Sequence, residues 1–283
     1  MSRVDVRKTY KLYIGGQFPR SESGRHTRLT RADGAFVANL SRASKKDLRD
    51  AVRAARKAQE PWAARSAFNR AQILYRMAEM VEARRHAFAP WLGPDHDAEV
   101  SAAVDRLVWY AGWADKFPQL FSAVNPVAAP YFNFTTPEPV GVVVIVAPRN
   151  APLLGLVSAL APVIVSGNTA VVVVDGESPT VAIDFAECLA TSDLPGGVVN
   201  ILTGPREDLL PTIGTHADID AVAAFGLTPE ERTALVRNGA ESMKRIKHWE
   251  DCAPAAWRSE DRQSPYWILP FVEHRTAWHP IGR

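Results

Sequence analysis

Short Val- and Ile-rich runs alternate with longer apolar segments between residues 132 and 225, and this alternation constrains the fold more than any other feature. The short runs at 140–147 and 170–174 are continuously apolar and do not alternate with polar residues. Strands of that kind are buried on both faces of a parallel sheet, and the segments at 152–165 and 179–190 have the length of crossover helices. The sequence therefore predicts an α/β fold with a Rossmann-like doubly wound parallel sheet.

The composition is that of a globular chain and excludes several classes of function. Of 283 residues, 47% are apolar and 23% are charged, which is enough material for a large buried core. The 33 basic and 31 acidic side chains nearly balance, so we expect neither a nucleic-acid partner nor a membrane partner. Prolines and a Ser-Gly-Asn break divide the uncharged stretch at 151–174 into pieces shorter than a membrane span of about 20 residues.

The cysteines and the N-terminus set expectations about metal content and compartment. Cys188 and Cys252 belong to no CxxC or Cys/His motif, so neither a disulfide framework nor a zinc site is predicted. Cys188 lies in an apolar helix and is expected in the core. His96, between two aspartates, is assigned to a solvated loop at 94–100 and not to a metal site. Residues 1–16 lack the apolar core of a signal peptide, so the cytoplasmic compartment is expected.

Segments on either side of the strand-rich region are predicted to wrap around it. Gly15-Gly16 between apolar runs predicts a hairpin. Ser44 is placed to cap an amphipathic helix, and a second such helix is predicted over 69–88. Aromatic residues at helical spacing over 105–123 predict a core-facing helix, and a further helix is expected over 229–243.

Several segments, in this order, resemble the cofactor domain of the NAD(P)-dependent aldehyde dehydrogenase superfamily. The resemblance rests on EPVGVVVIVAPRNAPLL, ALAPVIVSGNTAVVVV, SPTVAIDFAECLATSDLPGGVVNILTG and HADIDAVAAFG, and YIGGQF is similar to the N-terminal strand pair of that family. A chance match of several ordered blocks over residues 10–245 is improbable. The resemblance implies a cofactor-type domain over 1–250, wrapped by the N-terminal strands and helices, and an aromatic-rich tail with a closing strand over 251–283.

The resemblance locates one catalytic position of the family. Pro148-Arg149-Asn150 is similar to the Pro-Trp-Asn turn, in which the Asn amide stabilises the developing oxyanion. Asn150 is the one catalytic residue of the family that is retained. Because no nucleophile is expected beside it, its amide is interpreted as vestigial and as a partner of local backbone groups.

The positions that would bind the adenosine ribose have lost their polar side chains. The family motif Gly-Asn-Thr…Lys-Pro-Ser-Glu…Thr-Pro aligns without a gap on residues 167–179, which places Val173 at the Lys and Gly176 at the Glu. Each ribose hydroxyl left unpaired costs about 1–3 kcal/mol. No cofactor is therefore expected, and the NAD or NADP binding that the resemblance implies is predicted to be weak or lost.

The pyrophosphate position is altered in the same direction. Gly226 is retained, but Leu227 replaces the family Ser at the start of a helix whose amides receive the phosphates. The following Thr-Pro-Glu-Glu at 228–231 predicts a capping box with proline at the first helical position. Its carboxylates neutralise the helix end where the family binds an anion, so the sequence favours helix stability over phosphate binding.

The nucleophile of the family and its domain have no counterpart after residue 246. There the family continues into Glu-Leu-Gly-Gly and a catalytic domain, whereas residues 247–283 differ. Glu250 lies near the general-base position without a following Gly-Gly, and Cys252 does not match a nucleophile carried on a separate domain. Intrinsic catalysis is therefore expected to be absent.

The end of the chain suggests assembly. EHRTAWHPIGR resembles the C-terminal end of the tandem (family sixteen) aldehyde dehydrogenases, whose second domain is a non-catalytic copy. Residues 271–278 suit a half-buried strand, which is expected to pair with the sheet edge of a neighbouring chain and to form a contact there. Trp249 and Trp257 are assigned to the interior.

The sequence leaves three functional hypotheses open. The first is a non-catalytic subunit, a pseudoenzyme, that assembles with a full-length aldehyde dehydrogenase or with itself through the C-terminal tail. The second is a nucleotide-binding module without chemistry, because an α/β crevice can accept a nucleotide in an altered pose. The third is an active aldehyde oxidoreductase with Cys252 as nucleophile and Glu250 or His248 as base, although acidic neighbours disfavour a thiolate.

Overall fold

A parallel sheet lies at the centre of the computed structural model, which describes residues 4, 8–30, 34–176 and 179–282. The strand order is β10-β9-β6-β7-β8, and every neighbouring pair is parallel. From β6 the chain first adds β7 and β8 on one side and then β9 and β10 on the other side, as in a doubly wound sheet. The predicted fold class is therefore confirmed. The strands are β6 (Val142–Val146), β7 (Thr169–Val174), β8 (Val199–Thr203), β9 (Ala221–Phe225) and β10 (Arg245–Trp249).

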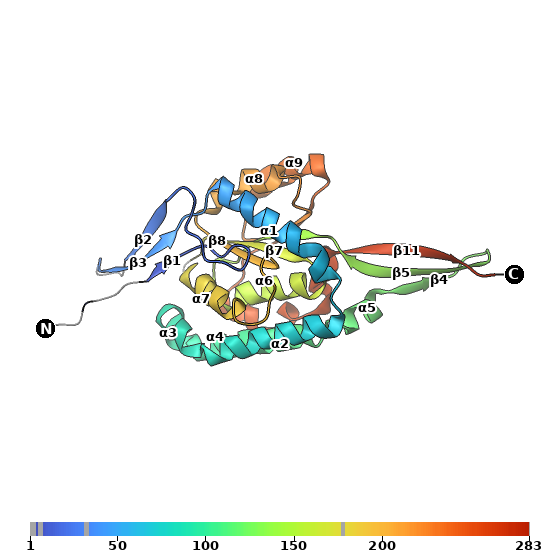
Figure 1. Cartoon of the computed structure of the whole chain (residues 1–283), viewed down its shortest axis with the longest axis horizontal. Helices are drawn as coiled ribbons and strands as arrows, with labels where there is room; N and C mark the ends of the chain where they lie inside the picture. The colour runs from blue at the N-terminus through green and yellow to red at the C-terminus, as the bar shows by residue number, and fades with distance from the viewer. Residues whose placement is uncertain (1–3, 5–7, 31–33, 177–178, 283) are drawn as a thin grey trace.

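Helices cover both faces of this sheet, as Figure 1 shows. Strands β6 and β7 are buried throughout, which explains their unbroken Val and Ile content. One face carries α1 (Lys45–Ala63), α8 (Leu210–Thr215) and α9 (Pro229–Gly239). The other carries α2 (Ala67–Ala83), α3 (Arg85–Leu92), α4 (His96–Ala111), α6 (Leu154–Val165) and α7 (Pro179–Leu189).

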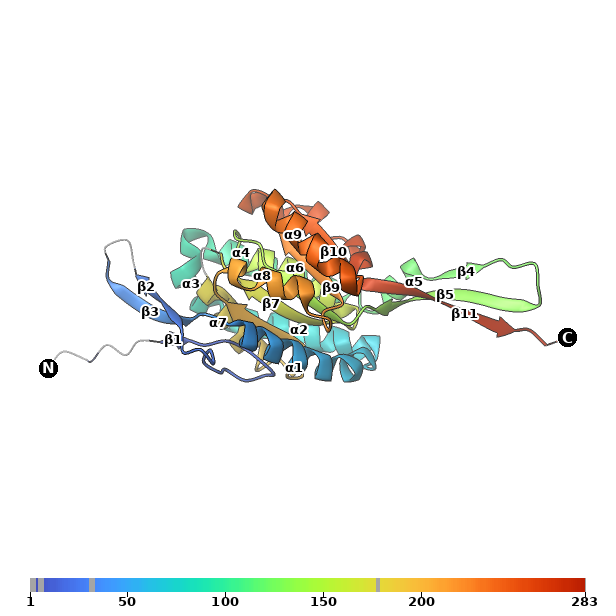
Figure 2. The same cartoon turned by 90° about the horizontal axis from the view of Figure 1, so that it is seen from above.

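Two small sheets project from opposite ends of the molecule (Figure 2). The N-terminal sheet contains β1 (Thr9–Tyr10), β2 (His26–Thr30) and β3 (Phe36–Ser41). The opposite sheet, here called the arm, contains β4 (Ala123–Asn125), β5 (Tyr131–Pro139) and β11 (Val272–Pro280). Short α5 (Lys116–Phe121) leads into it. Strand β11 is antiparallel to β5 of the same chain along its whole length and is exposed after Val272. The expected half-buried strand paired with a neighbouring chain is therefore wrong for this edge, because the end of the chain returns to a segment from its own middle.

Several predicted local structures are present. Ile14 and Gln17 exchange backbone hydrogen bonds around Gly15-Gly16, and both glycines have positive φ, as a tight hairpin requires. Ser44 caps α1 in a capping box with Asp47. The helix predicted over 69–88 is instead two helices, because the chain leaves helical geometry at Arg84.

The prediction of a loop over residues 94–100 is wrong. A short 3-10 turn, η1 (Gly93–Asp95), leads directly into α4, which begins at His96. Acidic residues in the first turn of α4 favour a helix start, and the Glu99 carboxylate accepts hydrogen bonds from the amides of Leu153 and Leu154 near the start of α6. The described residues contain no group of three or more His, Cys, Asp or Glu side chains arranged to hold a metal ion.

Residues 250–271 form a tail segment of short 3-10 turns between the central sheet and the arm. These turns are η4 (Pro254–Arg258), η5 (Glu260–Arg262), η6 (Pro265–Trp267) and η7 (Leu269–Phe271). Phe271 and Val272 are buried within the chain. Of residues 271–278, for which a contact with another chain was predicted, only those from 273 onward are therefore exposed to a partner. Within the part of the chain that is described, no helix is both long and apolar enough to cross a membrane.

Candidate functional site at the carboxyl ends of the parallel strands

The positions singled out from the sequence meet at one edge of the central sheet. Parallel strands end at the same edge, where ligands of open α/β sheets bind. The turn containing Pro148 and Asn150 follows β6, Gly176 follows β7, and Gly226 follows β9. The tail segment starts at this edge as well, because β10 ends at Trp249.

Both polar ends of the Asn150 side chain are bound by the tail segment. Its amide nitrogen donates to the carbonyl oxygen of Cys252, and its carbonyl oxygen accepts the indole N–H of Trp257 over 3.0 Å. The partners lie 102 and 107 residues further along the chain, so they are not the local groups expected from the sequence. The Asn150 amide is therefore bound by a backbone carbonyl of this chain at the position where the family resemblance implies an oxyanion.

Val173 and Gly176 occupy an apolar and a crowded position. Val173 is buried in the core beneath α1 and presents no polar atom at the strand end. A Cβ atom on Gly176 would lie 2.7 Å from the carbonyl oxygen of Arg149, closer than side chains approach. The turn after β7 therefore requires glycine, and a longer residue there needs the β6 turn to move.

The start of α9 is filled by side chains of this chain. Thr228 and Glu231 form the predicted capping box, which is confirmed. Leu227 is buried beside the same core as Val173. Gly226 has a φ of 58°, and a Cβ there would lie 2.3 Å from both carboxylate oxygens of Asp251. Carboxylates thus lie at and beside the helix end where the family resemblance implied a phosphate.

Arg206 is a buried cation at this edge that the sequence did not reveal. Its side chain is 2% exposed and forms a two-pronged ion pair with Glu231, with N···O distances of 3.1 and 2.8 Å. It also donates to the carbonyl oxygen of Gly226 over 2.8 Å. The Glu231 carboxylate thus satisfies the cap and the arginine at once. A bidentate pair of this kind holds η2 (Arg206–Asp208), after β8, against the start of α9.

A second ion pair connects the turns after β6 and β7. The Arg149 guanidinium donates to both carboxylate oxygens of Asp175, over 3.1 and 2.8 Å. The hydrogen bond with Asp175 raises the pKa of Arg149, although partial burial opposes the rise. Arg149 stands where the family has Trp, and no signal in the sequence pairs it with Asp175. The two turns are therefore tied to each other across the mouth of the site.

The tail segment is anchored by an arginine of α4 and by stacked aromatic rings. Arg106 is buried and donates to the carbonyl oxygens of Trp257 and Arg262 and to the Ser158 hydroxyl. Burial lowers the pKa of Arg106. Trp249 stacks on Phe225 with ring centroids 4.9 Å apart, and Trp267 lies at the same distance from Trp249. The tail therefore packs as an extension of the core, with Trp257 fully buried.

The model of the aldehyde dehydrogenase family matches residues 18–248, which include all of the central sheet except the last residue of β10. The chain belongs to the aldehyde dehydrogenase family. It is 32% identical to retinal dehydrogenase 2 of Gallus gallus over 256 residues, covering 86% of this chain and 48% of that protein. It is 33% identical to mitochondrial aldehyde dehydrogenase of Homo sapiens over 224 residues, covering 75% and 43%.

Two solved structures with a closely similar fold support the family assignment. An NAD+ complex of the aldehyde dehydrogenase from Bacillus cereus superposes with a TM-score of 0.79 at 29% identity, and covers 86% of this chain and 51% of that protein. PnpE from Pseudomonas sp. WBC-3 also reaches a TM-score of 0.79. This aldehyde dehydrogenase family member spans about half the length of the relatives that it matches.

The two cysteines of this family member lie in different surroundings. Cys188 is buried in α7, and burial raises its pKa to about 11, which agrees with the core position predicted for it. Cys252 packs against the core on the α6 side of the sheet, whereas His248 and Glu250 line a pocket beside α9 on the other side. The structure thus does not bring Cys252 together with the bases suggested from the sequence.

Proposed function

We propose that this chain is a non-catalytic member of the aldehyde dehydrogenase family that assembles with a complete, NAD(P)-dependent aldehyde dehydrogenase. The observation that carries the proposal is the engagement of Asn150 by the tail segment. The family uses this amide to stabilise an oxyanion, and here it donates to the Cys252 carbonyl while Trp257 binds its other end. A substrate oxygen would have to displace both contacts.

The cofactor positions support the same proposal. Val173 offers no cation to a ribose, and Gly176 cannot be lengthened without moving Arg149. The Asp251 carboxylate lies against Gly226, where it opposes the approach of a phosphate. An anionic dinucleotide would meet fixed negative charge and apolar surface here, so we expect NAD and NADP to bind weakly or not at all.

The arm is the surface that we propose for assembly. Figures 1 and 2 show that it extends beyond the helical layers of the molecule. Its strands β11 and β4 are edge strands, and three strands rarely remain stable without a packed apolar face. Apolar side chains are exposed on and beside it, namely Val124, Tyr131, Phe132, Trp278 and Ile281. A partner that covers them would explain why they are exposed, and pairing along the outer edge of β11 would supply the hydrogen bonds.

Capture of the chain from its own cells tests the proposal. The chain is tagged at its N-terminus and expressed at native level, and native mass spectrometry weighs the complexes in the eluate. We expect a complex of fixed stoichiometry with a full-length aldehyde dehydrogenase that survives about 0.5 M salt, because apolar contacts are not screened. A second copy of this chain alone would favour self-association, and a monomer would contradict the proposal.

A matched pair of variants links the complex to the arm. Trp278→Ser and Phe132→Ser remove exposed apolar contacts, so the fold should be retained and the complex lost. Val236→Ser, an equally exposed apolar residue on α9, serves as the control and should leave assembly unchanged. Loss of the complex in the control but not in the arm variants would contradict the assignment of the arm.

A further inference from the structure

His248 on β10 has a buried ring nitrogen without a hydrogen-bond partner. Its side chain is 6% exposed, and Nδ1 lies 3.4 Å from the Glu250 carboxylate. Within the described residues nothing accepts from or donates to Nε2. Native structures rarely bury a polar atom without a partner unless it has a role or receives a partner from outside the chain.

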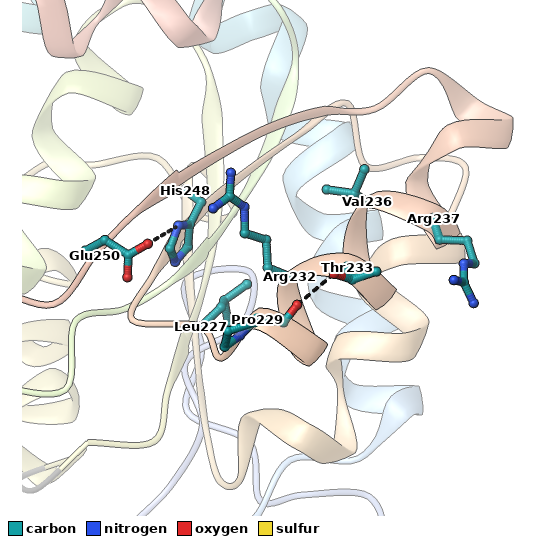
Figure 3. Close-up of a pocket in the computed structure, with 8 residues that line it drawn as sticks. All are labelled: Leu227, Pro229, Arg232, Thr233, Val236, Arg237, His248 and Glu250. Carbon is teal, nitrogen blue, oxygen red and sulfur yellow. Dashed lines mark hydrogen bonds and ion pairs between the residues drawn. The ribbon is translucent and has the colours of Figure 1, made fainter.

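The ring lines a pocket of about 580 Å³ between β10 and the outer face of α9. Figure 3 shows the imidazole between Glu250 and the guanidinium of Arg232, with Leu227 and Pro229 nearby. The Arg232 side chain is exposed and forms no hydrogen bond or ion pair with another side chain or carbonyl of the described residues. Leu227, Pro229 and Val236 supply apolar surface. The pocket thus combines unused polar groups with an apolar wall, as small-molecule sites do.

We propose that this pocket binds a small organic carboxylate. One carboxylate oxygen accepts from Arg232 and the other from Nε2–H of His248, whose Nδ1 lies on the side of Glu250. The apolar body of the ligand lies against Leu227, Pro229 and Val236. Glu250 repels the anion, so the ligand contacts the Nε2 side of the ring, opposite Glu250.

The pocket shares Leu227 and the carboxyl end of β10 with the candidate functional site, but Asn150 and the groups that bind it, Cys252 and Trp257, do not line it. The pocket lies beside α9, whereas Asn150 and the tail segment pack on the α6 side of the sheet. The inference therefore does not depend on the proposed function. Loss of partner binding and loss of carboxylate binding are separate results for the full chain.

Titration of the purified full chain with three probes tests the ligand class. Benzoate carries the carboxylate and an apolar body, benzyl alcohol carries the body alone, and inorganic phosphate carries the charge alone. At about 0.15 M salt we expect benzoate to bind with a Kd of about 1 mM or tighter, and each other probe about tenfold more weakly. Equal binding of benzyl alcohol or of phosphate, or no benzoate binding, would overturn the proposal.

Variants on one helix locate the site. Arg232→Gln should weaken benzoate about tenfold, because it removes a charge-assisted hydrogen bond. Arg237→Gln removes the same charge from α9, but Figure 3 shows that this side chain points away from His248, so binding should change by less than about twofold. Equal effects of the two variants would assign the binding to general surface charge and overturn the site.

Two substitutions of His248 distinguish the roles of its two ring nitrogens in binding. His248→Gln places an amide nitrogen near Nε2 and should keep part of the affinity, whereas His248→Asn places one near Nδ1 and should lose it. Thermal unfolding checks that both variants fold. Equal binding by the Asn variant and the parent would overturn the role of Nε2, and the exposed Arg232 keeps the proposal testable if either His248 variant fails to fold.

Discussion

Trp257 donates its indole N–H to the side-chain carbonyl of Asn150 over 3.0 Å, and the two residues are 107 positions apart in the chain. The same Asn150 side chain donates to the Cys252 carbonyl. Two points of the tail segment are thereby fixed to the turn after β6. The residue that most resembles a catalytic group of the family functions here as a structural clamp on the tail.

Asn150→Ala should destabilise the fold. It leaves the Trp257 indole and the Cys252 carbonyl without partners in a mostly buried region, at a cost of about 1–3 kcal/mol in the free energy of unfolding. Urea denaturation monitored by tryptophan fluorescence measures the change. Asn69→Ala, on the exposed start of α2, is the control and should change stability by less than about 0.5 kcal/mol. An unchanged Asn150→Ala variant would remove the evidence for a clamp.

Arg206→Met should be more damaging than loss of a surface ion pair. It leaves the Glu231 carboxylate and the Gly226 carbonyl without their buried donor, and breaking a buried pair costs about 3 kcal/mol or more. Arg275→Met removes the partner of Glu138 on the exposed arm, where a pair contributes about 0–1 kcal/mol. Equal midpoints of urea unfolding in the two variants would contradict the structural role of Arg206.

Cys188 should make stability depend on pH in alkaline solution. Burial raises its pKa from 9.0 to about 11, so the unfolded thiol ionises before the folded one. The stabilisation is complete below pH 9 and is lost as pH rises through 11, with a total of about 2–3 kcal/mol. Comparison of the parent with Cys188→Ala at pH 8 and pH 11 isolates this contribution from other titrating groups. The same pH slope in both proteins would show that Cys188 does not contribute.

Restoring one family residue should not restore coenzyme binding. Val173→Lys introduces a lysine where the family resemblance implies a ribose ligand. The Asp251 carboxylate still lies against Gly226, and Arg206 still binds Glu231. We expect no measurable NAD binding by calorimetry for this variant. The double variant Val173→Lys, Asp251→Gly is compared with Val173→Lys alone. NAD binding by Val173→Lys alone would show that residue 173 by itself limits the affinity for coenzyme.

Much of the fold could be predicted because its causes are local in the sequence. Continuous apolar runs identified β6 and β7, and Thr228 with Glu231 marked the start of α9. The acidic segment at 94–100 was misassigned because charge alone suggested a loop. Its Glu99 instead caps the distant start of α6, which is a tertiary contact that no local pattern records.

The site was less predictable because its partners are far apart in the sequence. Family positions identified Asn150, Val173 and Gly176, but not the groups that contact them. The ion pair of Arg206 with Glu231 and the anchoring of the tail by Arg106 depend on side chains that meet only after the sheet has formed. The boundary predicted at residue 250 and the interface on the arm stay predictions.

Titration of the purified chain with NAD and NADP, followed by an assay of aldehyde oxidation, is the decisive measurement for the proposed loss of catalysis. We expect no saturable binding up to about 1 mM coenzyme and no turnover, because groups of this chain lie where the family resemblance implies the oxyanion and the phosphate. Micromolar coenzyme binding together with aldehyde oxidation that Cys252→Ser abolishes would contradict the account and identify an active enzyme.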